Sequence, residues 1–147
     1  MKKTFSILSI FILLVFSTLS TNSCGSREDT VSCFPSVPIN VTLLPNNYND
    51  LATKQWTYVN MDGAGTRGLI VVKVGVNAYR AYDRNAPHIC PDSNTTLKVD
   101  FPIVTCPKDN AKWNILSGEP LEISPLPLKS YFCQVDSATN SITIYNY

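Results

Sequence analysis

The fold of this sequence is decided by Ala86-Pro87-His88-Ile89-Cys90-Pro91-Asp92 and by Val104-Thr105-Cys106-Pro107-Lys108-Asp109-Asn110. Both segments place a cysteine close to a second side chain that can bind a metal. His88 lies two residues before Cys90, and Asp109 lies three residues after Cys106. His88 is the only histidine of the 147 residues, which excludes multi-histidine metal sites and any histidine-based triad without it.

The chain from Trp56 to Tyr145 resembles the Rieske domain family, most specifically in the second segment. Cys106-Pro107-Lys108-Asp109-Asn110, followed by Trp113 and Gly118, is similar to the family pattern of Cys-Pro-x-His-Gly, an aromatic residue and a later glycine. The resemblance implies an all-β fold, a small antiparallel sandwich or barrel with two loops that face one cluster. A Rieske [2Fe–2S] centre takes two cysteines on one iron and two histidines on the other.

The ligand positions depart from the family pattern. The resemblance puts His88 at the first cysteine position and Cys90 at the first histidine position, while Asp109 replaces the second histidine. A carboxylate is a hard ligand and suits a cluster poorly. We therefore expect no cofactor. One alternative is a [2Fe–2S] cluster held by His88, Cys90, Cys106 and Asp109, which would make the protein an electron carrier. Another metal, or free thiols at Cys90 and Cys106, is the remaining alternative.

The resemblance also implies how the cysteines pair. It places Cys90 and Cys106 at the tips of neighbouring loops, where an oxidising envelope favours a disulfide. Cys33 and Cys133 would then form a second bond by elimination. The alternative is a buried Cys133 that packs as a small apolar residue, with Cys33 free. A redox carrier built on Cys90 and Cys106 is disfavoured, because the short C-x-x-C spacing is absent.

Other polar and aromatic residues have structural interpretations. An acid–base pair of Asp92 and Asp109 is disfavoured, because Asp109-Asn110 is typical of a turn. Four aromatic residues are expected in the core more than in a ligand groove, namely Tyr79, Tyr82, Phe101 and Trp113.

Patterns typical of strands run through the chain after residue 38. The segment 39–43 alternates apolar and polar residues, and Leu69 to Val74 is a nearly continuous apolar run expected at the sheet centre. The remaining expected strands are 56–59, 78–82, 97–100, 103–105, 113–115, 131–135 and 142–145. Tyr48 to Thr53 is expected to form one helical turn.

Residues 1–23 are interpreted as a lipoprotein signal peptide, with a basic start at Lys2 and Lys3 and an apolar run from Ile7 to Phe16. Ser23-Cys24-Gly25-Ser26 resembles a bacterial lipoprotein cleavage site, with Cys24 lipidated. The alternative is an ordinary cleaved signal with Cys24 as a spare thiol. Residues 24–37 are expected to be a tether, and residues 38–147 a Rieske-like β domain.

Charge excludes one class of partner. The chain has 12 basic and 11 acidic residues, and removing Lys2 and Lys3 with the signal leaves 10 against 11. A balance near zero, with no Lys/Arg cluster, argues against nucleic-acid binding. The sequence therefore predicts a non-enzymatic lipoprotein of the bacterial cell envelope, facing the periplasm or the outside. Its expected partners are the membrane, through the lipid, and an unidentified protein.

Overall fold

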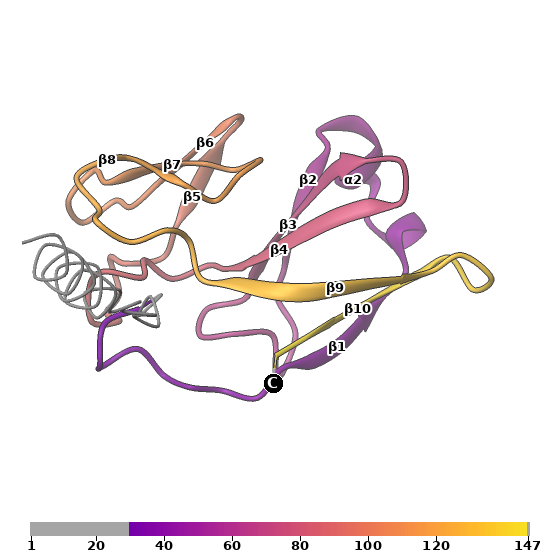
Figure 1. Ribbon diagram of the computed structural model, residues 1–147, viewed down its shortest axis with the longest axis horizontal. Helices are drawn as coiled ribbons and strands as arrows, with labels where there is room; N and C mark the ends of the chain where they lie inside the picture. Colours follow the sequence, from indigo (N-terminus) through magenta and orange to yellow (C-terminus); the bar gives the residue numbers. More distant parts are fainter. Residues whose placement is uncertain (1–29, 147) are drawn as a thin grey trace, which may run out of the picture.

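Residues 30–146 are described by a computed structural model, in which they form two antiparallel β-sheets (Figure 1). The larger sheet has six strands in the order β1 (Asn40–Leu43), β10 (Ser141–Tyr145), β9 (Ser130–Asp136), β4 (Ala78–Asp83), β3 (Leu69–Gly75) and β2 (Trp56–Val59). The smaller sheet has four strands in the order β5 (Lys98–Asp100), β6 (Ile103–Thr105), β7 (Lys112–Asn114) and β8 (Pro120–Glu122). The predicted all-β class is confirmed.

Most of the expected strands are present, and one strand was not predicted. β8 has three residues, begins at Pro120 and contains exposed side chains, so it carries no alternating pattern. Between β1 and β2 lie a 3-10 turn, η1 (Pro45–Asn47), and a short helix, α2 (Asn49–Thr53). The helical turn predicted for Tyr48 to Thr53 is therefore confirmed.

The apolar run of β3 is explained by burial on both faces of the strand. Leu69 and Val71 belong to a core cluster under the larger sheet, while Ile70 and Val72 belong to a second cluster shared with the smaller sheet. All four side chains have no exposed surface. β3 lies next to the edge strand β2, not at the sheet centre as predicted. Both of its faces are nevertheless buried, because the smaller sheet covers the face that an antiparallel sheet often leaves exposed.

The second core cluster joins the two sheets. Trp113 of β7 is fully buried in it, and its indole N–H donates to the Leu126 carbonyl oxygen at 2.9 Å. Tyr82 of β4 is buried in the same cluster, and Tyr79 packs against the other one. The core interpretation holds for Trp113 and Tyr82, while Tyr79 is only partly buried; Tyr79 and Tyr82 also line a surface cleft. The core interpretation is wrong for Phe101, which is 41 % exposed at the turn between β5 and β6.

The described part of the predicted tether, residues 30–37, is attached to the domain. The Val31 amide donates to the Pro87 carbonyl at 2.9 Å, and Phe34 is buried. The Asn146 side-chain amide donates to the Val37 carbonyl at 2.9 Å. The predicted signal peptide and Cys24 lie outside the described residues. Within residues 30–146, none of the helices has the length and apolar character needed to cross a bilayer.

Candidate functional site

The first loop, residues 86–92, leaves the larger sheet at the end of β4 and returns through residues 93–97. The Ala86 amide donates to the Thr95 carbonyl at 3.0 Å, and the Thr95 hydroxyl donates to the Asn85 side-chain oxygen at 2.7 Å. The Asp92 side chain accepts from the Asn94 amide at 2.7 Å and so closes a local turn. These bonds fix the base of the loop, and His88 and Cys90 lie in its outer part.

The second loop, residues 106–111, is the tight connection between β6 and β7. The Cys106 amide donates to the Ala111 carbonyl at 2.9 Å, and the Asn110 amide donates to the Cys106 carbonyl at 2.9 Å. Asn110 has a φ of 63°, in the left-handed region where asparagine is one of the few tolerated non-glycine residues. Asp109 accepts from the Ala111 amide at 3.1 Å. The predicted turn role of Asp109-Asn110 is therefore confirmed.

Asp109 also lies between the two loops and joins His88 to Cys106. Its carboxylate is 2.7 Å from His88 Nε2, and the Cys106 thiol forms a hydrogen bond with the same side chain. An ionised carboxylate has no proton to donate, so His88 Nε2 and the thiol are the donors. His88 Nδ1 is buried and has no hydrogen-bond partner among the described residues. Three of the four residues at ligand positions thus bind one another.

The electrostatics of this group favour an ionised Asp109 and a protonated Cys106. Burial would raise the pKa of Asp109, but hydrogen bonding outweighs burial and holds that pKa below its ordinary value. Burial, together with the neighbouring Asp109, raises the pKa of the Cys106 thiol. A buried thiol with a raised pKa is a poor nucleophile, because the thiolate is the reactive species. The arrangement does not provide an activated cysteine.

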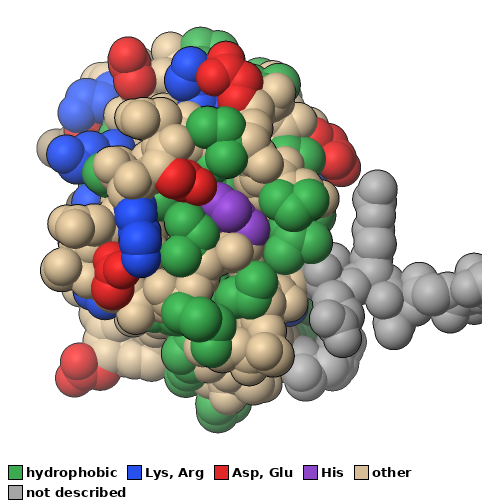
Figure 2. Space-filling view, turned by 90° about the vertical axis from the view of Figure 1, so that its left-hand side faces the viewer, with side chains coloured by type: hydrophobic (Ala, Val, Ile, Leu, Met, Phe, Trp, Pro, Cys, Tyr) green, Lys and Arg blue, Asp and Glu red, His purple; other side chains and the backbone are tan. Residues whose placement is uncertain are grey.

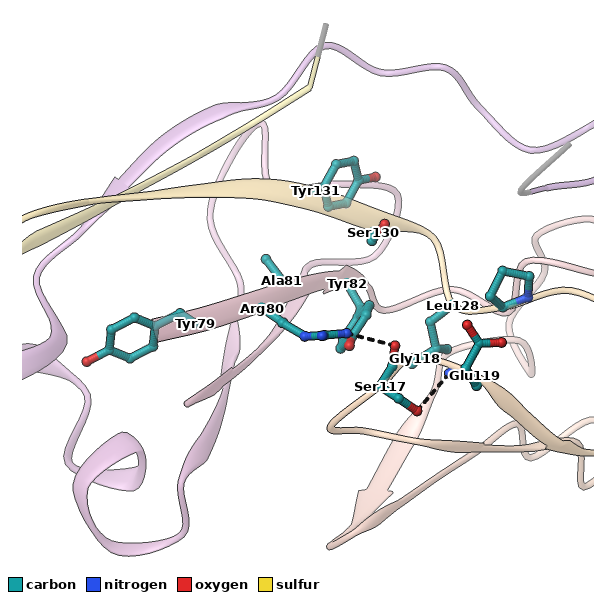
Figure 3. Close-up of a pocket in the computed structure, with 11 residues that line it drawn as sticks. Tyr79, Arg80, Ala81, Tyr82, Ser117, Gly118, Glu119, Leu128, Ser130 and Tyr131 are labelled. Carbon is teal, nitrogen blue, oxygen red and sulfur yellow. Dashed lines mark hydrogen bonds between the residues drawn. The ribbon is translucent and has the colours of Figure 1, made fainter. Parts of the chain in front are cut away.

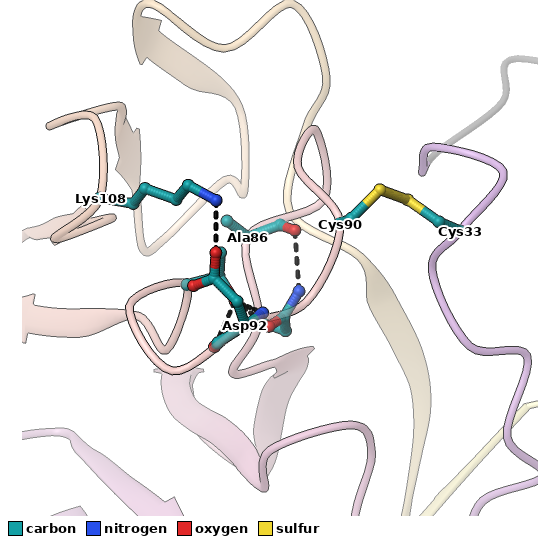
Figure 4. The surroundings of a disulfide bond; sticks show 7 residues. Cys33, Ala86, Cys90, Asp92 and Lys108 are labelled. Carbon is teal, nitrogen blue, oxygen red and sulfur yellow. Dashed lines mark hydrogen bonds and ion pairs between the residues drawn. A yellow bond between two sulfur atoms is a disulfide. The ribbon is translucent and has the colours of Figure 1, made fainter.

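The disulfide is different from the one predicted. Cys90 is bonded to Cys33, with an S–S distance of 2.03 Å, and Cys106 and Cys133 are free thiols (Figure 4). The expected Cys90–Cys106 and Cys33–Cys133 pairs are therefore wrong. The physical reason is the course of the N-terminal segment, which passes beside the first loop and brings Cys33 to Cys90. Cys106 instead lies inward, with no exposed surface.

A second polar contact between the loops is made by Lys108 and Asp92. The Lys108 ammonium forms an ion pair with the Asp92 carboxylate (Figure 4). Both side chains are about two-fifths exposed, so the pair contributes little to stability. Asp92 and Asp109 each have a basic partner from the other loop, and they do not form a carboxylate pair with each other.

The two loops reach the surface on one face of the molecule. Figure 2 shows the histidine of this chain partly exposed, with hydrophobic side chains around it and an acidic side chain against it. The His88 side chain is 10 % exposed and that of Asp109 is 27 % exposed. Within residues 30–146, no three His, Cys, Asp or Glu side chains are grouped so as to hold a metal ion. Sequence reasoning missed Cys33 as part of this site, since no local pattern connects it to Cys90.

Two solved structures are similar to this fold. One is the ferredoxin of carbazole 1,9a-dioxygenase from Nocardioides aromaticivorans IC177, with a TM-score of 0.45, 20 % identity, and coverage of 76 % of this chain and 100 % of that chain. The other is the complex of reduced oxygenase and oxidized ferredoxin in carbazole 1,9a-dioxygenase, with a TM-score of 0.47, 20 % identity, and coverage of 76 % and 94 %. No family model and no curated protein matches the chain.

A likeness of this extent does not transfer a cofactor, a partner or an activity to the chain. Function has to be inferred from the residues described above.

Proposed function

We propose that this chain is an envelope lipoprotein whose Rieske-like domain has lost the standard cluster ligands and serves a structural or binding role. The observation that carries the proposal is the Cys33–Cys90 disulfide. Cys90 occupies one of the four ligand positions, and a sulfur atom in a disulfide is not a thiolate that can ligate iron. The loops are held together by bonds between protein side chains.

The remaining donors do not fit a Rieske centre either. The Cys106 thiol stays protonated and donates a hydrogen bond to the Asp109 carboxylate. His88 Nε2 donates a hydrogen bond to the same carboxylate. A Rieske centre needs two thiolates and two imidazoles, and this chain offers one histidine in total. The chemistry of the donor set therefore disagrees with the cluster that the family resemblance implies.

The role of the group is then structural. The Cys33–Cys90 bond attaches the N-terminal segment to the first loop, and His88 and Asp109 attach the first loop to the second. Such contacts hold two loops in fixed positions, as a cluster would. Fixed loops at one face of a domain suit the recognition of a protein partner, because less ordering is needed on binding.

The experiment that tests the proposal combines iron analysis with cysteine mapping. The protein is purified from an oxidising compartment and unfolded in an alkylating agent without reductant. We expect a linked Cys33–Cys90 peptide, alkylated Cys106 and Cys133, no visible absorbance, and no iron or sulfide after anaerobic reconstitution. Stoichiometric iron and sulfide with a visible spectrum would overturn the proposal and favour the electron-transfer alternative.

A matched pair of variants makes the iron test sharper. Cys33→Ser frees Cys90 without any reductant, whereas Cys133→Ser leaves the disulfide in place. If the disulfide were the only obstacle, Cys33→Ser would gain a cluster on reconstitution and Cys133→Ser would not. We expect both variants to remain colourless, because His88 and Asp109 still cannot supply the two imidazoles.

The lipid anchor is tested separately. We expect the mature N-terminus to carry acyl chains on Cys24, seen as added mass on the N-terminal peptide, and Cys24→Ser to release the protein from the membrane fraction. Two or more acyl chains are needed for a stable anchor. An unmodified N-terminal peptide would rule the anchor out and leave the domain proposal intact.

A further inference from the structure

A cleft lies where β4 and β9 of the larger sheet face the turn between β7 and β8. Its volume is about 310 Å³, at the lower end of the range for small-molecule sites. Figure 3 shows the side chains that line it, which come from β4, β9, residues 117–119 and residues 127–128. None of the residues that join the two loops lines this cleft, so its use is independent of the proposed function.

The wall of the cleft contains a buried hydroxyl whose proton has no acceptor. Tyr82 is 1 % exposed, and Arg80, which has donors only, is the one side chain that hydrogen-bonds its hydroxyl, so the hydroxyl proton has no acceptor among the described residues. Gly118 packs against its ring so closely that a Cβ there would lie 2.8 Å from Tyr82 Cε1. Buried polar groups are nearly always paired, so an unpaired donor is unusual. The hydroxyl proton is therefore free to bond an acceptor that enters the cleft.

Arg80 lies beside Tyr82 and adds positive charge at the same place (Figure 3). Its guanidinium donates to the Ser117 carbonyl at 2.9 Å, which uses one of five N–H donors. A guanidinium has no acceptor, so it cannot take the proton of the Tyr82 hydroxyl. The two side chains therefore present donors only, and a carboxylate is a ligand group that accepts from both.

Glu119 supplies the opposite charge in the same lining. Its backbone amide donates to the Ser117 hydroxyl at 3.2 Å, which fixes the turn that carries it. A ligand with a carboxylate alone would be repelled by Glu119, whereas a ligand that also carries an ammonium group would be attracted. The Tyr131 hydroxyl already donates to Asp83 at 2.8 Å, so this ring offers mainly apolar surface to the cleft.

We propose that this cleft binds a small zwitterion of the α-amino-acid class. The ligand carboxylate accepts from Arg80 and Tyr82, and its ammonium group faces Glu119. The volume suits one amino acid better than a long peptide. Charge complementarity is the reason for preferring this class, since the cleft carries one cation and one carboxylate.

The test is a calorimetric titration of the purified full-chain protein. The probes are glycine and a series of larger free amino acids, with acetate and methylammonium as ligands that carry one charge each. We expect at least one amino acid to bind at millimolar concentration or below, and acetate and methylammonium to bind more weakly. Absence of binding by every amino acid would overturn the proposal, as would acetate binding as tightly as the best amino acid.

Variants identify the groups that carry the binding. We expect Tyr82→Phe to weaken binding by about tenfold or more, as for a lost hydrogen bond to a charged group, without loss of thermal stability. Glu119→Gln should weaken the binding of the amino acid and should leave the affinity for acetate unchanged or increase it. Tyr48→Phe, which alters a tyrosine outside this cleft, is the control. Equal affinity of Tyr82→Phe and the unmodified protein would contradict the assignment.

Discussion

Among the residues at the predicted ligand positions, Asp109 is the one whose side chain joins the two loops. It accepts hydrogen bonds from His88, the Cys106 thiol and the Ala111 amide, and this group lies over the second core cluster. A carboxylate with several donors is stabilised in its ionised form. Asp109, which departs from the family pattern at the second histidine position, is thus the acceptor on which the contacts between the loops depend.

Replacement of Asp109 by alanine should destabilise the fold. His88 Nε2 and the Cys106 thiol would lose their acceptor, and we expect a loss of about 1–3 kcal/mol in the free energy of unfolding. The folded pKa of Asp109 is depressed, so its contribution is present above the unfolded pKa of about 4 and is lost as pH falls through the folded pKa. Urea unfolding at neutral and acid pH measures both effects. Asp100→Ala, an exposed carboxylate at the end of β5, is the control.

The two free thiols within residues 30–146, Cys106 and Cys133, should react slowly at neutral pH. Burial raises the pKa of Cys133 to about 11, and burial with Asp109 raises that of Cys106. Because the folded pKa is raised, the stability contributed by the Cys133 thiol is present below the unfolded pKa and is lost as pH rises through about 11. We expect alkylation of the native protein to accelerate steeply in alkali. Fast labelling of Cys133 near pH 7 would contradict the partial burial of this side chain.

At the scale of elements, the Cys33–Cys90 bond converts an N-terminal segment into part of the domain. The bonded residues are 57 apart in sequence, and the chain-entropy account assigns such a loop about 4 kcal/mol. The adjacent Val31 amide and Pro87 carbonyl add a backbone hydrogen bond at 2.9 Å. Residues 30–37 are therefore held by covalent and hydrogen bonds near the loops.

Breaking this bond should cost more than removing either free thiol. We expect the double variant Cys33→Ser/Cys90→Ser to lose about 2–4 kcal/mol of unfolding free energy in urea. Cys106→Ser is the informative comparison, because the pairing predicted from the sequence would make it equally damaging. If Cys106 were bonded to Cys90, Cys106→Ser would free Cys90, and the unfolded variant would show one more free thiol than the unmodified protein. With the Cys33–Cys90 bond it shows one fewer.

At the scale of the whole molecule, Asp83 joins segments that are distant in sequence. It has no exposed surface, and its carboxylate accepts from the Thr66 amide, the Asn85 amide and the Tyr131 hydroxyl, each at 2.8 Å. These donors come from the connection between β2 and β3, the segment just before the first loop, and β9. Burial raises the pKa of Asp83, and the hydrogen bonds offset part of that effect.

Asp83→Asn should therefore lower the stability of the whole domain. The substitution replaces one carboxylate oxygen by an NH2 group, which is a donor facing another donor. We expect a loss of about 1–3 kcal/mol in the free energy of unfolding. A double-mutant cycle with Tyr131→Phe isolates the pair, and we expect a positive coupling energy. Additive effects of the two substitutions would show that the Tyr131 hydrogen bond contributes nothing.

The sequence by itself determined most of the strands, the turn at Asp109-Asn110 and the all-β class. These features depend on alternation, short apolar runs and turn residues, which are local and can be seen in a window of a few residues. Only the tertiary structure decided which cluster each face of β3 packs against. It also decided the burial of Cys106 and the position of the cleft beside Tyr82. The pairing of Cys33 with Cys90 was decided in the same way, because a disulfide forms where packing brings two Cα atoms within reach, here 5.4 Å. Four cysteines of equal chemistry give no local sign of which two will meet, so this pairing follows from the path of the whole chain.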